Sequence, residues 1–369
     1  MKRILTVLIG LCCLLGGCLP TNTLDQTSMV EAEGFDYIGN GKVIGTIYMP
    51  SFEQTGTQGS QGAGLPSTAS MIRTLSGVTY DGKSLIDKFQ SEGQEVMRVG
   101  AMKAMLFDKK LAKHGLSRQM SFRNRDPDVP SAISIAVVDG SAKQLLRATN
   151  YQTQIPVSRY IQHLILQNSQ QNYPSTNLRY FLDNYYGAYM DPFMPLIRKS
   201  GDHLEIRGLA LFRHDKYVTS IPQRKMFLFK MLYEPFNQGV YDYQLPSGKH
   251  IALRNVQSSV RYRVKNGNGT SPRIDALVNV KGYIRQADPK TISTTSADRV
   301  EKKIAADLSD NAERMVHSFQ QKKIDPLRLG DTVRSFTRHF DGKTWGERYP
   351  AANFHCRVHL QIIQTGISS

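Results

Sequence analysis

Long apolar runs are scarce in this sequence of 369 residues. The most extended one, Ile4 to Leu15, is shorter than the roughly 20 residues that a membrane-spanning helix needs. No later run is as apolar over such a length. We therefore expect no membrane-spanning helix and a main body that folds in water.

Familiar catalytic motifs are also missing. There is no Gly-x-Ser-x-Gly elbow, no Walker loop and no His-Glu-x-x-His pair. Cys356 and His359, with His355, offer metal-ligand atoms, but His355 and Cys356 would point to opposite faces of a strand. These observations make an enzyme less expected and point to no cofactor and no metal site, although a catalytic site built from residues distant in the sequence is left open.

The N-terminus has the pattern of an export signal. Lys2-Arg3 supplies a positive start, and the apolar run follows and ends in Leu15-Gly16-Gly17-Cys18. A small-small-Cys ending is typical of the bacterial lipoprotein route, in which the Cys18 thiol receives a diacylglyceryl group and cleavage follows Gly17. The alternative is an ordinary signal peptide with an accidental cysteine. We predict that residues 1–17 are removed and that Cys18 anchors the chain to the outer face of a membrane.

Cysteine is scarce as well, with four residues in the whole chain. Cys12 and Cys13 would leave with the signal, and Cys18 would carry lipid. Cys356 is then the one free thiol, so the mature chain cannot form an intramolecular disulfide. We predict that Cys356 is a small buried hydrophobic residue on a strand.

The formal net charge of +16 restricts the classes of partner. Lys and Arg are scattered through every segment, without a zinc-finger spacing, an RRM signature or a dense basic run, so we expect no nucleic acid. A basic surface against anionic lipid headgroups is the preferred interpretation. A solvated face without a partner is the alternative.

The order of elements predicts an α+β chain with mixed and antiparallel sheets flanked by helices, in three domains. Residues 18–190 alternate strand and helix patterns and form the N-terminal α/β domain. Residues 51–66 lack large apolar side chains, which predicts a flexible loop. After it, Ser67 to Leu75 is expected to be a helix.

The remaining two domains differ in pattern. Residues 191–290 alternate apolar with polar positions and predict a middle, mainly antiparallel β domain with a short helix near Arg224 to Leu232. Residues 291–369 are expected to form a C-terminal α/β domain. Its long helix is indicated by apolar residues from Val300 to Phe319 at helical spacing, and Phe354 to Ile363 is the last strand.

Two groups of residues are candidates for a structural or interface role. Arg125 and Asp126 precede Pro127, which disfavours helical geometry, so this segment is predicted to be a structural corner. Arg261, Arg263 and Lys265 alternate along one strand and therefore point the same way. We expect this row, at the exposed edge of the middle sheet, to meet an acidic partner or lipid headgroups, or only to discourage aggregation. The outer face of the long helix is a second candidate contact surface.

Eight stretches occur in the order found in one known family. They are Leu15–Cys18, Gly34-Phe35-Asp36, Leu111–Leu116, Arg125-Asp126-Pro127, Ala136–Lys143, Gly208–Lys216, Ile324–Gly330 and Gly366. In these stretches the chain resembles the Ger(x)C family, the C-subunit lipoproteins of bacterial spore germinant receptors. Many members continue the anchor as Cys-Trp-Asp, whereas this chain has Cys18-Leu19-Pro20, which suggests a divergent branch. The Gly- and Gln-rich stretch before Ser67 is also unusual.

The resemblance implies a three-domain mixed α/β fold and a non-enzymatic subunit at the outer face of the spore inner membrane. It implies two partners, a transmembrane A subunit and a permease-like B subunit, and it supplies no catalytic residues. The alternative is a solute-binding lipoprotein of an importer, which would need two similar lobes around a cleft. A lipid-anchored hydrolase ranks third.

Overall fold

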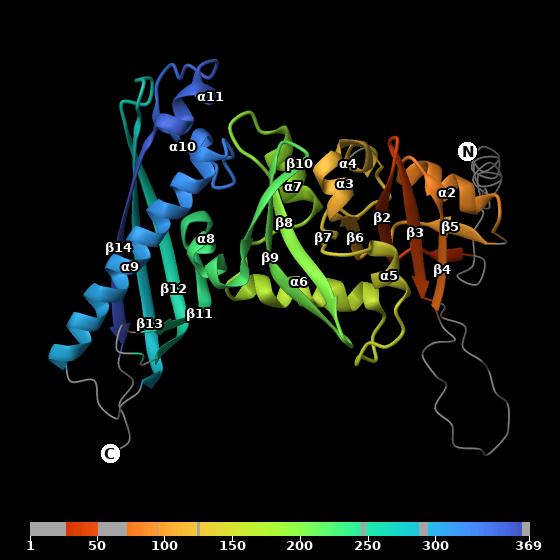
Figure 1. The fold of residues 1–369 in the computed structure, drawn as a ribbon, viewed down its shortest axis with the longest axis horizontal. Coiled ribbons are helices and arrows are strands. Elements are labelled where there is room, and N and C mark those ends of the chain that lie inside the picture. The colour runs from red at the N-terminus through yellow and green to blue at the C-terminus, as the bar shows by residue number, and fades with distance from the viewer. Residues whose placement is uncertain are drawn as a thin grey trace, which may run out of the picture.

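The computed structural model describes residues 27–50, 72–93, 95–123, 126–244, 248, 250–287 and 294–363. Cys18, Arg125 and the predicted loop 51–66 lie outside these residues. Among the helices that are described, none is both long and apolar enough to cross a bilayer. The fold is a mixed α+β fold, as predicted (Figure 1).

A sheet of eight strands forms the larger half of the molecule. In spatial order the strands are β10 (Lys216–Pro222), β9 (His203–Arg213), β8 (Phe193–Ser200), β7 (Ser134–Val138), β6 (Ala104–Asp108), β2 (Ala32–Gly39), β3 (Lys42–Pro50) and β4 (Ile72–Thr79). The central strands β2, β6, β7 and β8 run parallel, and antiparallel strands extend the sheet on both sides. Every residue of β6 and β7 is buried, as expected of strands covered on both faces.

Helices cover both faces of this sheet. They are α2 (Gly82–Gln90), α3 (Lys109–His114), α4 (Ser117–Arg123), α5 (Ala142–Arg147), α6 (Val157–Gln170) and α7 (Leu178–Tyr186). Leu106 and Val138 pack with α5 and α6, whereas Phe107 and Val137 pack with the other four helices. Two short strands, β1 (Thr27–Met29) and β5 (Val96–Arg98), form a separate parallel pair.

A second sheet, of four strands, forms the other half. Its order is β11 (Phe236–Gln244), β12 (His250–Lys265), β13 (Arg273–Ala287) and β14 (Asn353–Ile363), and β13 and β14 are parallel. The long helix α9 (Thr294–Gln321) and the buried helix α8 (Met226–Tyr233) pack against one face (Figure 1). Alternate residues of β14 are buried and exposed, so the face away from these helices is open.

Helix α9 also covers the edge of this sheet. Side chains from α9 accept hydrogen bonds from outward backbone N–H groups of the edge strand β14. Glu313 binds Cys356 N at 2.9 Å, Ser309 binds Val358 N at 3.1 Å, and Glu301 binds Ile362 N at 2.5 Å. These bonds satisfy amides that would otherwise be available to another strand.

Polar contacts join the two halves. Lys230 of α8 is 2% exposed, and its ammonium donates to the carbonyls of Ser169 and Gln171 at the end of α6. A cation is favourable at the negative end of a helix. Glu234 faces Lys230 at 3.7 Å and accepts from Ser175 N at 2.8 Å. Two short helices, α10 (Leu329–Phe336) and α11 (Trp345–Arg348), connect α9 to β14.

Two expectations differ from the structure. The helix predicted for Ser67 to Leu75 is wrong over its described part, because β4 pairs with β3 from Ile72 to Thr79. Residues 191–290 do not form one sheet, since β8, β9 and β10 join the first sheet and β11, β12 and β13 join the second with β14. The domain boundaries, as limits of independently folding units, remain predictions.

Candidate functional site

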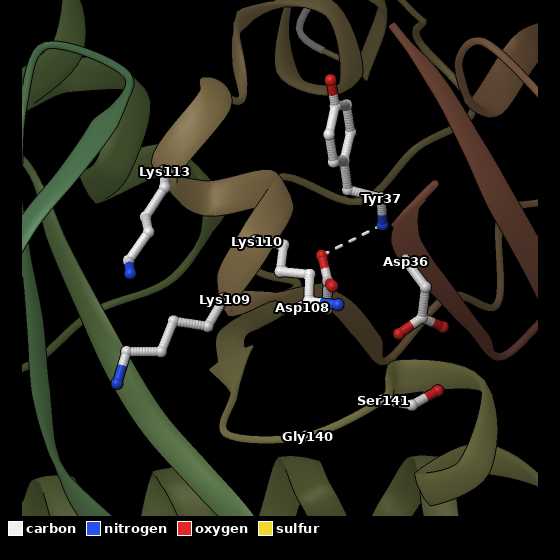
Figure 2. Close-up of a pocket in the computed structure, with 8 residues that line it drawn as sticks. All are labelled: Asp36, Tyr37, Asp108, Lys109, Lys110, Lys113, Gly140 and Ser141. Carbon is white, nitrogen blue, oxygen red and sulfur yellow. Dashed lines mark hydrogen bonds between the residues drawn. The ribbon is translucent and has the colours of Figure 1, made fainter. Parts of the chain in front are cut away.

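A crevice opens at the carboxyl ends of the parallel strands. Strand β6 continues into α3 on one face of the sheet, whereas its neighbour β7 continues into α5 on the opposite face. Crevices at such switch points are the usual ligand sites of parallel sheets. The crevice here has a volume of about 490 Å³ and is lined by Asp36, Tyr37, Asp108, Lys109, Lys110, Lys113, Gly140 and Ser141 (Figure 2).

The Asp36 carboxylate accepts hydrogen bonds from the first backbone N–H groups of α5. One of its oxygens accepts from Ala142 N and the other from Lys143 N, both at 2.8 Å. Ser141 caps the same helix by accepting from Gln144 N at 3.2 Å. Asp36 therefore fixes α5 to β2 instead of facing the crevice as a free acid.

The Asp108 carboxylate has the same role for α3. Its Oδ1 accepts from Leu111 N at 2.8 Å and from Tyr37 N at 3.1 Å (Figure 2). Burial raises the pKa of Asp108 above its ordinary value, and the hydrogen bonds from these amides oppose that shift. The carboxylate thus binds α3 and β2 together at the end of β6.

Three lysines of α3 give the crevice a positive border. Lys109 faces Asp139 at 3.7 Å and lies over the Tyr217 ring at 5.6 Å. Lys110 and Lys113 reach the rim (Figure 2). The helices that begin here have six residues each, and Asp36 and Asp108 already bind amides of their first turns. In the described part of the chain, no three His, Cys, Asp or Glu side chains are grouped as a metal site would require.

Three of the stretches that carry the family resemblance meet at this crevice. Gly34-Phe35-Asp36 lies on β2, Leu111–Leu116 runs from α3 into the turn after it, and Ala136–Lys143 runs from β7 through a turn into α5. A Cβ atom at Gly34 would lie 3.0 Å from both the Ala142 Cβ and the Leu146 Cδ1. Glycine at this position therefore lets α5 pack closely on the sheet. The shared residues here serve the joint between strands and helices.

The structure does not gather the predicted site residues into one site. Asp126 lies before β7, where its carboxylate accepts from Asp128 N at 3.0 Å, the bond of an Asx turn. Arg261, Arg263 and Lys265 are exposed on β12 in the other half of the molecule. They lie on the part of β12 that extends beyond its pairing with β11, which ends at Ser258.

The predicted cation row belongs to a larger set. Arg273 and Lys281 of β13 and Arg357 of β14 are exposed on the same face of the sheet. Sequence reasoning missed these three, although the alternation of polar and apolar residues on β13 and β14 was the signal that could have found them.

Cys356 has the environment that the sequence predicts. It is 8% exposed on β14, and its neighbour His355 points to the open face. Burial raises the pKa of the Cys356 thiol to about 12, and the nearby Glu313 carboxylate acts in the same direction. A thiol so rarely ionised is a poor nucleophile and a poor metal ligand.

Comparisons with known proteins cover nearly the whole chain. Residues 21–199 match the family model described as the spore germination protein N-terminal domain, and residues 207–366 match the one described as spore germination B3/GerAC-like, C-terminal. The sequence is 27% identical over 378 residues to the spore germination protein GerQC of Bacillus cereus, with 100% of both chains covered. It is 23% identical over 384 residues to YfkR of Bacillus subtilis (strain 168), whose name provisionally assigns it to spore germination, with 99% of this chain and 97% of that one covered. A crystal structure of the GerBC protein has a similar fold, with a TM-score of 0.53 at 14% identity, covering 90% of this chain and 96% of that one.

Proposed function

Because this chain belongs to the Ger(x)C family of spore germination proteins, we propose that it is the lipid-anchored C subunit of a nutrient germinant receptor. In this proposal the lipid on Cys18 holds it to the outer face of the spore inner membrane. The body acts by contact with its partners and not by catalysis. The observation that carries the proposal is that the two family models together match residues 21–199 and 207–366.

The crevice supports a role without catalysis. Its two carboxylates each accept two backbone N–H bonds from elements that they hold in place. Each carboxylate therefore has a structural role at the joint between strands and helices, which accounts for its position without catalysis.

The proposed partners are the membrane-embedded A and B subunits of the receptor. The outer face of α9 is the contact surface we propose for them, because charges of both signs alternate along it. Lys302, Asp310 and Arg314 are all exposed there, on a helix that packs firmly through Ile304 and Val316. A rigid charged helix suits recognition of a particular partner.

Within the described residues, the two sheets do not favour a solute-binding lipoprotein of an importer. Such a protein would need two similar lobes, whereas the two sheets here have eight and four strands in different orders. The crevice also lies within the eight-stranded half.

Co-purification and calorimetry together test the proposal. Affinity-tagged protein recovered from spore membranes is expected to bring the A and B subunits with it. Titration of the protein with amino acids, sugars and nucleosides is expected to give no saturable heat. Micromolar binding of any of these solutes, without co-purified subunits, would reject the receptor-subunit proposal in favour of the importer.

A further inference from the structure

One face of the four-stranded sheet is covered by no helix or strand among the described residues, and it carries cations on three strands. We call it the basic face and define it by six exposed residues, which are Arg261, Arg263, Lys265, Arg273, Lys281 and Arg357. Helices α8 and α9 pack on the opposite face of the same sheet (Figure 1). Five of the six cations lie on the part of the sheet beyond the end of β11, and Lys281 lies just inside it, opposite Gln257.

Strand register brings these cations close together. Lys265 lies directly opposite Arg273, and Arg261 and Arg357 lie on either side of Leu277. Neighbouring strands are about 4.8 Å apart, and residues two apart on a strand are about 6.6 Å apart. Like charges placed opposite each other destabilise a sheet. The array is thus dense, and the repulsion between its charges opposes folding instead of favouring it.

Little negative charge offsets this array. Asp275 is the acidic residue among the cations, and it pairs with Arg273 at 2.9 Å. Within the described part of the chain, no ion pair is found for the other five cations. His355 and His359 of β14 are exposed on the same face. Glu313 of α9 lies beside the edge of the sheet, with its carboxylate Oε1 3.8 Å from His355 Nδ1.

We propose that the basic face lies against the anionic headgroups of the membrane that carries the protein. An anionic bilayer is favoured over a protein partner because the exposed charge on this face is almost all of one sign. The outer face of α9, which we propose for the protein partners, carries charges of both signs. A bilayer surface suits a row of cations, since each nearby cation is attracted by the negative surface potential.

This inference rests on the proposed lipid anchor and adds an orientation to it. The four-stranded sheet lies at one end of the long axis of the molecule, and β5, with which β1 pairs, lies toward the other end (Figure 1). Cys18 precedes β1 in the sequence. A lipid at one end and a basic face at the other would hold the long axis along the membrane. One lipid-based and one electrostatic attachment is a common combination at membrane surfaces.

The test measures how close the basic face is to the bilayer in the full lipidated chain. The chain is inserted in vesicles of phosphatidylcholine alone, or mixed with phosphatidylglycerol, that contain a headgroup-attached quencher. A fluorophore is placed on the basic face through Asn279→Cys and, as a control, on the outer face of α9 through Asp310→Cys. The native Cys356 is buried and should not be labelled.

We expect strong quenching at position 279 and little at 310, only in vesicles with phosphatidylglycerol. Quenching should be lost near 1 M salt, where the screening length is about 3 Å. It should also be lost when Arg261, Arg263 and Lys265 are all changed to Glu. The matched control changes Arg299, Lys302 and Arg314 on α9 to Glu and should leave quenching intact. Equal urea midpoints verify that both variants fold.

Three results would overturn the inference. These are an unquenched label at 279 in anionic vesicles, equal quenching in both vesicle types, and quenching that the three changes on β12 do not reduce. Protection of the label only after the A and B subunits are added would assign the basic face to a protein partner instead. Failure of the anchor is seen separately, because a chain without lipid would not float with vesicles of phosphatidylcholine alone, to which the basic face has no electrostatic attraction.

Discussion

Asp191 and Asp325 bind each other's backbone across the joint between the two sheets. The N–H of Asp325 donates to the Asp191 carboxylate at 2.8 Å, and the N–H of Asp191 donates to the Asp325 carbonyl at 2.9 Å. The Asp325 carboxylate accepts from Leu329 N at 2.9 Å and Gly330 N at 2.7 Å. Burial raises the pKa of Asp325 to about 7, and the negative charge of Asp191 adds to the shift.

This pair predicts a pH-dependent stability. An acid whose pKa is about 7 in the folded chain and 3.8 in the unfolded chain binds its proton more strongly when folded. Its contribution to stability is therefore complete below about pH 4 and is lost as the pH rises to about 7. At about 1.4 kcal/mol per pKa unit, the loss is on the order of a few kcal/mol.

Asp325→Asn removes this titration and should flatten the dependence of the urea midpoint on pH between 4 and 7. Asp310→Asn, at an exposed position of α9, is the control and should keep the wild-type slope. Asp191→Asn should change the slope in the same direction as Asp325→Asn, because burial raises the pKa of Asp191 too. Equal slopes in all variants would contradict the assignment.

Two aspartates with different surroundings should differ in their effect on stability. Asp36 is 8% exposed and accepts two amide bonds at the start of α5. Asp36→Ala should therefore cost on the order of 2 to 3 kcal/mol of unfolding free energy. Asp126→Ala loses the bond of an exposed turn and should cost on the order of 1 kcal/mol or less. Thermal and urea unfolding measure both. An Asp126→Ala protein with unchanged stability and abolished germination would show that this residue acts at an interface.

The hydrogen bonds from α9 side chains to the edge strand β14 should protect the sheet from association with other chains. Glu313→Ala removes the acceptor for Cys356 N, whereas Glu313→Gln keeps an oxygen in the same place. We expect a loss on the order of 1 kcal/mol for the alanine variant and a smaller one for glutamine. Light scattering during mild heating should show more aggregation of Glu313→Ala, since an uncovered edge can pair with another chain. Identical behaviour of the two variants would mean that the bond has no protective role.

Membrane attachment should depend on Cys18. Cys18→Ala is expected to leave an uncleaved precursor or to place the protein in the soluble fraction, and incorporation of labelled fatty acid should be abolished. Cys356→Ala is the matched control and should stay lipidated. A Cys18→Ala protein that still carried lipid would refute the predicted anchor.

Most helices and strands could be predicted because their patterns are local. Ile304 and Leu308 lie one turn apart on α9, and Gly115 ends α3 as a C-cap. Strand β8 was missed because Pro195 interrupts its apolar run, and a proline argues against an inner strand. The structure accommodates Pro195 because pairing with β7 begins only at Leu196. The helix predicted for Ser67 to Leu75 was wrong over its described part because a short apolar run is compatible with either a helix or a strand. Pairing with β3 makes this segment a strand.

The candidate sites depended on contacts that no local pattern contains. The bond between Asp36 and Ala142 joins residues 106 positions apart. Arg261, Arg263 and Lys265 were found because they share one strand. Arg357 joins them only through the register of β12 with β13 and of β13 with β14.

The hydrogen bonds between α9 and β14 join two elements whose residues repeat at different spacings along their axes. Four residues of a helix advance about 6.0 Å, and two residues of a strand advance about 6.6 Å, so the two elements slip by about 0.6 Å at each step. From Glu313 to Glu301 the slip grows to about 1.8 Å over three steps. Long side chains act at both ends of this series, and the short Ser309 lies between them. The longer glutamate side chains thus compensate for this offset between helix and strand. A much longer edge strand could not be covered in this way by one straight helix.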